Sequence, residues 1–337
     1  MTMRPIALDA MGGDNAPAAI VAGASRAVRA GIPVILVGDE AVIKPLLPKG
    51  SKIKIVHAPE SIGMAESPSA AVRAKKDASI RVANRLVADG KASAVVGFGN
   101  TGALMAASLM ELGRIEGIDR PAVITTLPRS DGGQLVLLDL GANVDCKPSH
   151  LAQFAVMGHV FAQDVLQIET PRVGLLSNGE EEGKGNEQVR AAMPVLSELP
   201  IEFVGPVEPN FALHGGCEVV VCDGFVGNIM LKSVEAAIGV AGKVLKEEIL
   251  RRIDAKLGAR LLRGALQRYR KRTSSSGVGG AFLLGVNGTV LVGHGAADAA
   301  AVLSVIKRAH RAAEEGLTDH IGQAISEALQ GIAQDDT

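Results

Sequence analysis

Ser93-Ala-Val-Val-Gly-Phe-Gly-Asn-Thr-Gly102 indicates the fold most clearly, because an apolar run ends there in a polar turn and a helical pattern starts at once. Residues 135–143, 173–180 and 219–228 repeat this arrangement. A continuous apolar run suits a parallel strand that is buried on both faces. Backbone N–H groups in such turns bind anions, and ligands of open α/β sheets lie beyond the carboxyl ends of the strands. The four turns therefore predict one site, at one edge of one sheet, for a phosphate-bearing or otherwise anionic substrate.

Strand and helix patterns alternate along the whole chain. We expect strands at residues 6–9, 34–37, 53–57, 94–96, 122–126, 135–139, 173–177, 202–204, 219–222 and 289–292. We expect helices at residues 15–30, 67–88, 101–112, 148–165, 186–196, 296–315 and 318–329. This alternation predicts an α/β fold in which helices cover both faces of a mostly parallel sheet. No linker or repeat divides the chain, so residues 1–337 are expected to form a single α/β domain, in one or two lobes.

The composition excludes several classes of protein. Hydrophobic residues make up 47% of the chain, enough for a large core, and a net charge of −1 gives no general attraction to nucleic acid. Three cysteines are too few for a disulfide framework and favour the cytosol. His214, Cys217 and Cys222 lack a fourth ligand at zinc-site spacing, so we expect no metal. No apolar run approaches about 18 uninterrupted residues, and the N-terminus lacks a signal peptide's apolar region, so no membrane span is expected.

One basic segment departs from the alternating pattern. Residues 244–272 carry ten Lys or Arg side chains against three acidic ones, which gives a net charge of +7. Apolar residues recur every four positions from Leu245 to Ala265. This spacing predicts an amphipathic helix, or a helical pair broken near Gly258 or Gly264.

Two kinds of partner suit this basic segment. It can pack on its own protein or on a dimer mate, or it can contact an anionic surface such as a lipid headgroup layer or an acidic protein. The two coexist if the helical pair projects from the body of the molecule. Ser274-Ser-Ser-Gly277 is then a flexible return, and the projecting segment spans about residues 240–276.

The turn after the first strand places carboxylates beside glycines. Its candidate ligands are Asp9, Gly12, Gly13 and Asp14, although Asp14 can equally cap the next helix.

The turn at residues 97–102 literally matches the dinucleotide pattern G-x-G-x-x-G. Its glycines are Gly97, Gly99 and Gly102. The next strand ends in Thr126-Leu-Pro-Arg129, without the acid that binds a ribose. Asn100 and Thr101 also place polar side chains where a dinucleotide turn needs little bulk. We therefore favour a cradle for a phosphate or an acyl carrier over an NAD(P) site, which remains an alternative.

The later turns carry charged and amide side chains. They contain Asn143 and Lys147, then Lys184, Gly185 and Asn186, and then Asp223, Gly227 and Asn228. Lys184 stands between two glycines beside a helix start, which suits an anion ligand or an electrophilic stabiliser. The Walker A spacing fails because Gly185 follows the lysine, so ATP hydrolysis is not expected. Lys147 precedes a helix start, where the dipole favours anions. His294, between two glycines, is a candidate base or phosphate ligand.

Six motifs occur together between about residues 5 and 315. They are Asp9-Ala-Met-Gly-Gly-Asp-Asn-Ala-Pro17, Gly99-Asn-Thr-Gly-Ala103, Asp139-Leu-Gly-Ala-Asn-Val-Asp-Cys-Lys-Pro148, Gly179-Glu-Glu-Glu-Gly-Lys-Gly-Asn186, Val221-Cys-Asp-Gly-Phe-Val-Gly-Asn228 and Leu284-Gly-Val-Asn-Gly288. Together they resemble the bacterial phosphate acyltransferases of phospholipid synthesis. The sequence departs from that family's pattern at residues 205–211, where an Arg-Asp pair is missing, and at residues 278–282.

The resemblance implies a fold, partners and a location. The fold is a Rossmann-like three-layer sandwich related to phosphate acetyltransferases and isocitrate dehydrogenases, with a projecting helical pair. The partners are acyl carrier protein and inorganic phosphate, and the acyl phosphate product serves a membrane glycerol-3-phosphate acyltransferase. A cytoplasmic homodimer in reversible, peripheral contact with the membrane is implied, with no cofactor.

The expected reaction assigns roles to the candidate residues. Lys184 and Asn228 are expected to bind the phosphate and the oxyanion, with Asn100, Thr101 and Asn143 as further donors. Acidic side chains, Asp223 among them, would orient these groups. Two rival functions remain: an NAD(P)-dependent dehydrogenase on a related fold, and a non-catalytic scaffold on the membrane surface.

Overall fold

One twisted sheet runs through the whole molecule. The structure, a computed structural model, describes residues 4–181, 183–273 and 280–335; the expected return at residues 274–277 and the departure at 278–279 lie outside them. Eleven strands of the described chain pair in the order β3-β2-β1-β4-β11-β10-β5-β6-β9-β7-β8. They are β1 (Ile6–Asp9), β2 (Val34–Gly38), β3 (Lys54–His57), β4 (Ala94–Gly97), β5 (Ala122–Pro128), β6 (Gln134–Leu138), β7 (Arg172–Leu176), β8 (Glu202–Val207), β9 (Val219–Val221), β10 (Ala281–Leu284) and β11 (Thr289–Val292).

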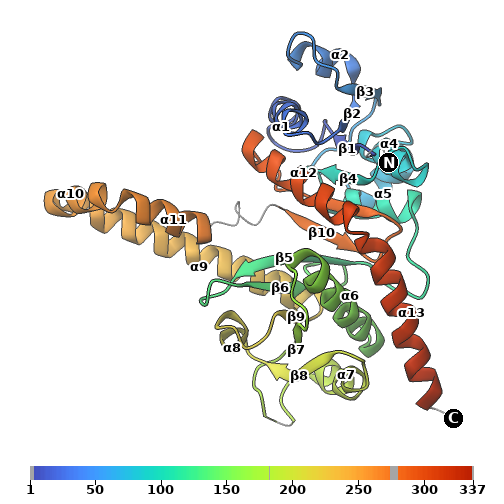
Figure 1. Cartoon of the computed structure of the whole chain (residues 1–337), viewed down its shortest axis with the longest axis vertical. Helices are drawn as coiled ribbons and strands as arrows, with labels where there is room; N and C mark the ends of the chain where they lie inside the picture. Colours follow the sequence, from blue (N-terminus) through green and yellow to red (C-terminus); the bar gives the residue numbers. More distant parts are fainter. Residues whose placement is uncertain (1–3, 182, 274–279, 336–337) are drawn as a thin grey trace.

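Helices cover both faces of this sheet (Figure 1). They are α1 (Ala18–Arg29), α2 (Glu40–Ile43), α3 (Pro68–Ala74), α4 (Ser79–Ala88), α5 (Thr101–Glu111), α6 (Pro148–Leu166), α7 (Glu187–Ser197), α8 (Pro209–Leu213), α9 (Gly224–Arg251), α10 (Ile253–Leu261), α11 (Arg263–Thr273), α12 (Ala299–Glu314) and α13 (Leu317–Asp335), with a 3-10 turn η1 (Lys44–Leu46).

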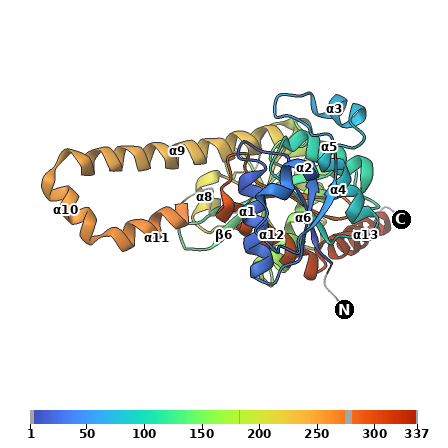
Figure 2. The same ribbon diagram turned by 90° about the horizontal axis from the view of Figure 1, so that it is seen from above.

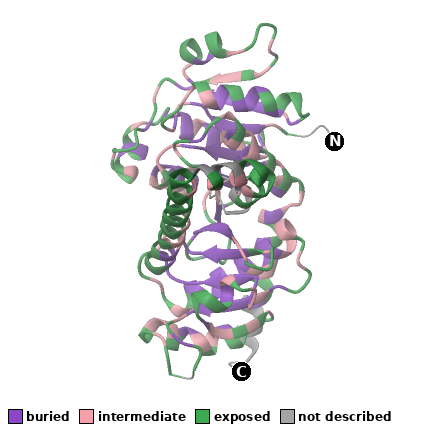
Figure 3. Ribbon diagram, turned by 90° about the vertical axis from the view of Figure 1, so that its left-hand side faces the viewer, coloured by how far each residue is buried: buried purple, intermediate pink, exposed green. Residues whose placement is uncertain are grey.

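Two separate apolar cores confirm the expected three layers. Successive side chains of a strand point to opposite faces, and in β1 Ile6 and Leu8 belong to one core while Ala7 belongs to the other. The first core lies against α1, α6, α12 and α13, and the second lies against α4 and α5. Figure 3 shows the strands buried between these helices.

The sheet is mostly parallel, but it reverses direction in its middle. The pairs β11–β10, β10–β5 and β5–β6 are antiparallel, whereas β1–β2, β1–β4, β4–β11, β6–β9, β7–β9 and β7–β8 are parallel. Three reversals are an odd number, so β6, β7 and β9 run opposite to β1, β4 and β11. The expectation of four strand ends at one edge is therefore wrong: the carboxyl end of β4 lies at the edge opposite to those of β6, β7 and β9.

Two elements differ from the sequence expectation. The single helix expected at residues 67–88 is two helices, α3 and α4, because residues 75–78 leave the helical path and Ala78 forms a bridge with Glu60. β10 was not expected, although its four apolar residues precede the hairpin-turn signal Asn287-Gly288. It forms a hairpin with β11 that occupies the middle of the sheet.

The basic segment forms a hairpin of helices that projects from the body (Figure 2). α9 leaves the body, and α10 and α11 return beside it. The first break lies at Arg252, whose backbone is extended (φ −124°, ψ 141°), and the second lies at Leu262. The projection is thus confirmed. Of the two expected positions for a break, Gly264 is close to the one at Leu262, whereas Gly258 lies inside α10.

α9 also bears on the expectation that no segment spans a membrane. Within the described chain it is one helix that is long and apolar enough to cross a membrane by length and composition. One such helix is weak support for a membrane span, because helices of soluble proteins can pass the same test of length and composition. Its first turn packs on the loop after β6, and Lys232, Glu235 and Lys243 lie along its length.

Candidate active site

The candidate residues form two groups at opposite edges of the sheet. The first, which we call the β4 group, follows β1, β4 and β11 and contains Asp9, Gly12, Gly13, Asp14, Gly99, Asn100, Thr101, Gly102 and His294. The second, the β9 group, follows β6, β7 and β9 and contains Asn143, Lys147, Lys184, Gly185, Asn186, Asp223, Gly227 and Asn228.

Close backbone approach defines the β4 group. A Cβ atom at Gly12 would lie 2.9 Å from the Cα of Gly99 and 2.9 Å from Oδ2 of Asp9. Gly13 has φ +111°, a conformation that glycine adopts without strain. The N–H of Asp14 donates to the carbonyl of Gly295 at 2.8 Å, which joins the turns after β1 and β11. These glycines let three turns meet.

Asp9 orients its own turn. Its Oδ1 accepts from the N–H of Met11 at 3.0 Å, and the Ser79 hydroxyl is a further partner. Burial raises the pKa of Asp9, and these hydrogen bonds oppose the rise. A small pocket here is lined by Asp9, Ser79, Gly99 and Asn100, among others. The buried carboxyl of Asp9 therefore lines the pocket and does not project from it.

Asn100 uses both ends of its amide. Its Oδ1 caps α5 by accepting from the N–H of Ala103 at 3.1 Å, and its Nδ2 donates to the carbonyls of Met64 and Glu66, both at 3.2 Å. Donation to an oxyanion stays a prediction, and it requires Asn100 to exchange one of these bonds. Thr101 is exposed at the same helix start.

A backbone hydrogen bond to Nδ1 of His294 leaves its Nε2 as the ring's hydrogen-bond donor. The N–H of Ala296 donates to its Nδ1 at 3.2 Å, so the neutral ring carries its proton on Nε2. The side chain is exposed. Of the two roles expected for it, this tautomer favours a ligand that donates to phosphate over a base.

Asp139 organises the loop after β6, and the sequence reading did not include it among the site residues. This carboxylate is fully buried and accepts five hydrogen bonds. The donors are the N–H groups of Val123 (2.9 Å), Leu140 (2.6 Å), Ala142 (3.2 Å) and Asn143 (2.6 Å) and Nδ2 of Asn143 (3.0 Å). Burial raises the pKa of Asp139, and the N–H donors oppose the rise. An acid directly after a buried strand was the available signal.

The start of α9 lies against this loop. Asp223 caps the helix by accepting from the N–H of Val226 at 2.9 Å, and the N–H of Gly224 donates to the carbonyl of Asn143 at 2.7 Å. A Cβ at Gly227 would lie 2.0 Å from the carbonyl oxygen of Asp139, so only glycine permits this approach. Asn228, half-buried, follows on the same turn and lies beside Gly141.

The loop after β7 completes the β9 group. Gly185, at φ +87°, donates its N–H to Oδ1 of Asn178 at 2.9 Å, and Asn186 caps α7 by accepting from Val189 at 2.9 Å. The stem of Lys184 packs on Gly179, and its ammonium forms no ion pair with any described residue.

Contacts tie the β7 loop to the β6 loop. Nε2 of Gln188 donates to the carbonyl of Cys146 at 2.8 Å, next to Lys147 at the start of α6. The Ser177 hydroxyl, which the sequence reading missed, is buried beside Gly185 and has no hydrogen-bond partner in the described part of the chain. Two lysines, three helix starts and an unpartnered hydroxyl give the β9 group donors for an anion, beside the carboxylates of Asp139 and Asp223.

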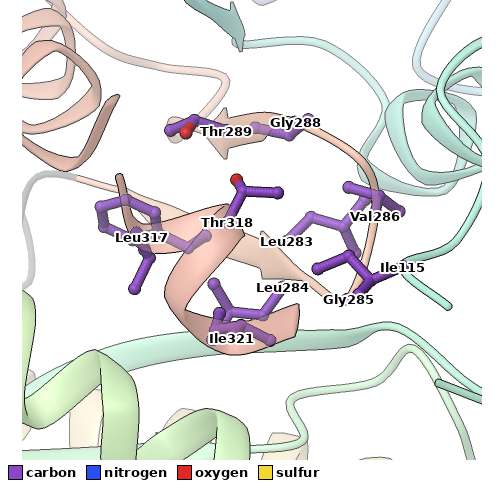
Figure 4. A pocket seen from close by; sticks show the side chains of 12 residues that line it. Ile115, Leu283, Leu284, Gly285, Val286, Gly288, Thr289, Leu317, Thr318 and Ile321 are labelled. Carbon is purple, nitrogen blue, oxygen red and sulfur yellow. The ribbon is translucent and has the colours of Figure 1, made fainter. Parts of the chain in front are cut away.

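Other features of the described chain do not compete with this site. It contains no cluster of three or more His, Cys, Asp or Glu side chains placed to hold a metal. A second hollow lies between the β10–β11 hairpin and the start of α13 (Figure 4). Ile115, Leu284 and Ile321 line it among twelve residues, none of which is charged. Its apolar wall does not suit an anion.

Comparisons with known proteins agree with the resemblance found in the sequence. A family described as "Fatty acid synthesis protein" matches residues 4–320. The chain is 48% identical over 327 residues to a phosphate acyltransferase of Trichlorobacter lovleyi, covering 96% of this chain and 94% of that protein. It is 49% identical over 324 residues to a phosphate acyltransferase of Pelotomaculum thermopropionicum, covering 95% and 94%.

Solved structures share the fold at low sequence identity. A phosphotransacetylase from Streptococcus pyogenes superposes with a TM-score of 0.61 at 19% identity, covering 91% of this chain and 94% of that one. The EutD phosphotransacetylase from Staphylococcus aureus gives 0.60 at 18% identity, covering 92% and 94%. At these identities the likeness concerns the fold alone, and it confirms the expected relation to phosphate acetyltransferases.

Proposed function

The chain belongs to the phosphate acyltransferase family, and from this membership we propose that it transfers a fatty acyl group from acyl carrier protein to inorganic phosphate, giving an acyl phosphate for phospholipid synthesis. Its activity as a phosphate acyltransferase follows from relatives about half identical over nearly the whole chain. The carrier as donor, and the fate of the product, are the proposed parts. Relatives with this name favour the acyltransferase over a dehydrogenase or a non-catalytic scaffold.

The β9 group carries the proposal for where transfer occurs. A phosphate oxygen attacks the thioester carbonyl, a tetrahedral oxyanion forms, and the C–S bond breaks to release the carrier thiolate. Phosphate is already anionic at neutral pH, so positioning and charge neutralisation matter more than a strong base. The start of α9 supplies the positive end of a helix dipole. Gly227 packs this helix closely on the Asp139 loop, and Asn228 then lies beside Gly141 of that loop, which supports a role for Asn228.

Within this site Lys184 neutralises phosphate and Asn228 donates to the oxyanion. β7 and β9 are neighbours in the sheet, so the Lys184 loop and the α9 start follow adjacent strands. Asn143, whose own amide bonds Asp139 and the carbonyl of Pro121, positions the loop between them. Asn100 and His294, which the sequence also offers as ligands, belong to the β4 group at the opposite edge of the sheet, so this step is proposed without them.

A thiol-release assay tests this function. Palmitoyl-acyl carrier protein is incubated with the protein, with and without phosphate, and free carrier thiol is measured. Lys184→Ala should cost at least about 2 kcal/mol of transition-state stabilisation, as for an oxyanion-hole donor. Lys49→Ala removes a lysine that is also exposed but lies in the turn before β3, and it should leave the rate unchanged. Near-normal turnover by Lys184→Ala would remove that residue from the mechanism.

The projecting hairpin supports the proposed partners. Leu261 and Leu262 are 85% and 60% exposed near its tip, beside Arg260 and Arg263. Exposed leucines next to arginines suit a membrane surface with anionic headgroups, and such a surface fits a cytoplasmic homodimer that binds membranes peripherally. Acyl carrier protein, being acidic, would dock on surface Arg and Lys, so its association should slow as salt rises. Flotation of the protein with anionic but not neutral vesicles, lost in Leu261→Asp, tests the membrane contact.

A further inference from the structure

Four apolar side chains are exposed beside the β9 group. Val144 and Phe225 are each 58% exposed, Ile229 is 49% exposed and Val226 is 38% exposed. Large apolar side chains this exposed, and gathered rather than scattered, indicate a binding surface. We call these four residues the α9-start patch.

The patch comes from two segments that the structure brings together. The N–H of Gly224 donates to the carbonyl of Asn143 at 2.7 Å. Phe225 and Val144 directly follow these two residues, so the two segments that carry them are in contact. Ile229 lies one turn after Phe225 on the same side of α9, because residues four apart share a helix face. The patch therefore continues across the loop–helix junction.

Polar site residues adjoin the patch directly. Asn228 is next to Ile229 in the first turns of α9, and Asn143 is next to Val144. The buried side of the same turns, Gly227 and Met230, packs against the protein. A few polar groups beside an apolar wall are the usual makeup of a site for a ligand with one polar and one apolar end.

We propose that the α9-start patch binds the fatty acyl chain next to the reacting carbonyl. This inference rests on the proposed function and deepens it by assigning the apolar part of the substrate. The polar end of an acyl thioester or acyl phosphate must lie at the β9 group, so its chain leaves from that group. The patch is the exposed apolar surface that continues from Asn228 and Asn143. Covering it with a chain removes both apolar surfaces from water.

Chain-length dependence separates this role from others. The variant is Phe225→Ala, and kcat/KM is measured with palmitoyl and acetyl thioesters of the same carrier. The palmitoyl value should fall about tenfold, which corresponds to about 1.4 kcal/mol. The acetyl value should not change, because an acetyl group has no chain to contact the ring. Phe225→Leu should restore most of the palmitoyl rate, and Leu46→Ala, an exposed residue in η1 of the other half, should change neither.

Two results would overturn the assignment. Equal losses with both donors would mean that Phe225 acts on the carrier, the fold or the reacting groups. A change of oligomeric state in Phe225→Ala, seen by light scattering, would make the patch an interface between copies of the chain.

A labelling experiment tests the patch independently of turnover. A long-chain acyl phosphonate with a diazirine near its polar end is photolysed on the intact wild-type protein. Label within residues 224–231 or at Val144 is expected, and label elsewhere contradicts the assignment. If wild-type protein labels at the patch yet transfers no acyl group from the carrier, the proposed donor fails while the acyl-chain site stands.

Discussion

Replacing Glu218 by Gln should destabilise the half of the sheet that carries the β9 group. Glu218 precedes β9, and its side chain is only 10% exposed. Its Oε1 lies 2.8 Å from Nη1 of Arg129 and 2.8 Å from Nη2 of Arg172, and its Oε2 accepts from Nε of Arg172 at 3.0 Å. The carboxylate thus joins the end of β5, the start of β7 and the start of β9.

The magnitude follows from the pKa of Glu218. Burial alone would raise this pKa, but hydrogen bonds from Arg172 and Arg129 outweigh burial and lower it from 4.5 to about 2. Each pKa unit corresponds to about 1.36 kcal/mol, so ionised Glu218 contributes about 3 kcal/mol to the free energy of unfolding. Breaking a buried pair by removing one partner costs a similar amount, about 3–5 kcal/mol.

The same pKa gives the sign of the pH dependence. The folded pKa is lower than the unfolded value of 4.5, so the stabilisation is fully present above that pH. It is lost as the pH falls from 4.5 toward about 2. Stability of the wild-type protein should therefore decline in this acid range, and the difference between it and Glu218→Gln should shrink there.

Urea unfolding followed by far-UV circular dichroism measures both effects, since the chain has no Trp for fluorescence. Glu40→Gln is the control, because its carboxylate is half exposed and pairs with Lys44 across a helix turn. It should change stability by less than about 0.5 kcal/mol. A loss for Glu218→Gln below about 1 kcal/mol at neutral pH, within the range of a single neutral hydrogen bond, would refute the reasoning. So would a difference that stays constant into acid.

Three further substitutions test how the two groups are built. Gly227→Ala places a Cβ 2.0 Å from the Asp139 carbonyl oxygen, so it should lower stability by about 1–3 kcal/mol and abolish transfer, measured by thermal unfolding and thiol release. Asp223→Ala removes the α9 cap and should cost about 1 kcal/mol in urea unfolding, and no loss would show that the cap is dispensable. Gly12→Ala would put a Cβ 2.9 Å from Gly99, and if the β4 group takes part in transfer, kcat should fall more than stability alone explains.

Much of the fold was predictable from local pattern. Buried strands such as β6 and β9 are short apolar runs that end in polar turns, and the structure confirms them. β10 was missed although its apolar run is followed by Asn287-Gly288, a hairpin-turn signal that leads into β11. The break at Arg252 was also missed, since a charged residue with extended backbone looks helical within a basic helical pattern.

The site was predictable in composition but not in arrangement. The turns, their glycines and their amides were identified from sequence, yet their division between two edges depends on three antiparallel pairings. Asp131-Gly-Gly133 and Asn287-Gly288 are hairpin-turn signals for two of them, and only the pairing of β10 with β5 joins distant segments and has no local pattern. Asp139 and Ser177 were missed because their importance lies in contacts: five accepted hydrogen bonds in one case and an unpartnered hydroxyl in the described chain in the other. The roles of Lys184 and Asn228 stay predictions.

Trapping the product tests the central claim most directly. Because hydroxylamine also cleaves the donor thioester, the acyl carrier protein is first removed by ultrafiltration. Hydroxylamine then converts the acyl phosphate into a hydroxamate, which mass spectrometry separates from free fatty acid. With palmitoyl-acyl carrier protein and phosphate, the wild-type protein should give palmitoyl hydroxamate in step with thiol release, and neither should form without phosphate. Thiol release with free palmitate alone, whatever the phosphate concentration, would contradict acyl transfer to phosphate.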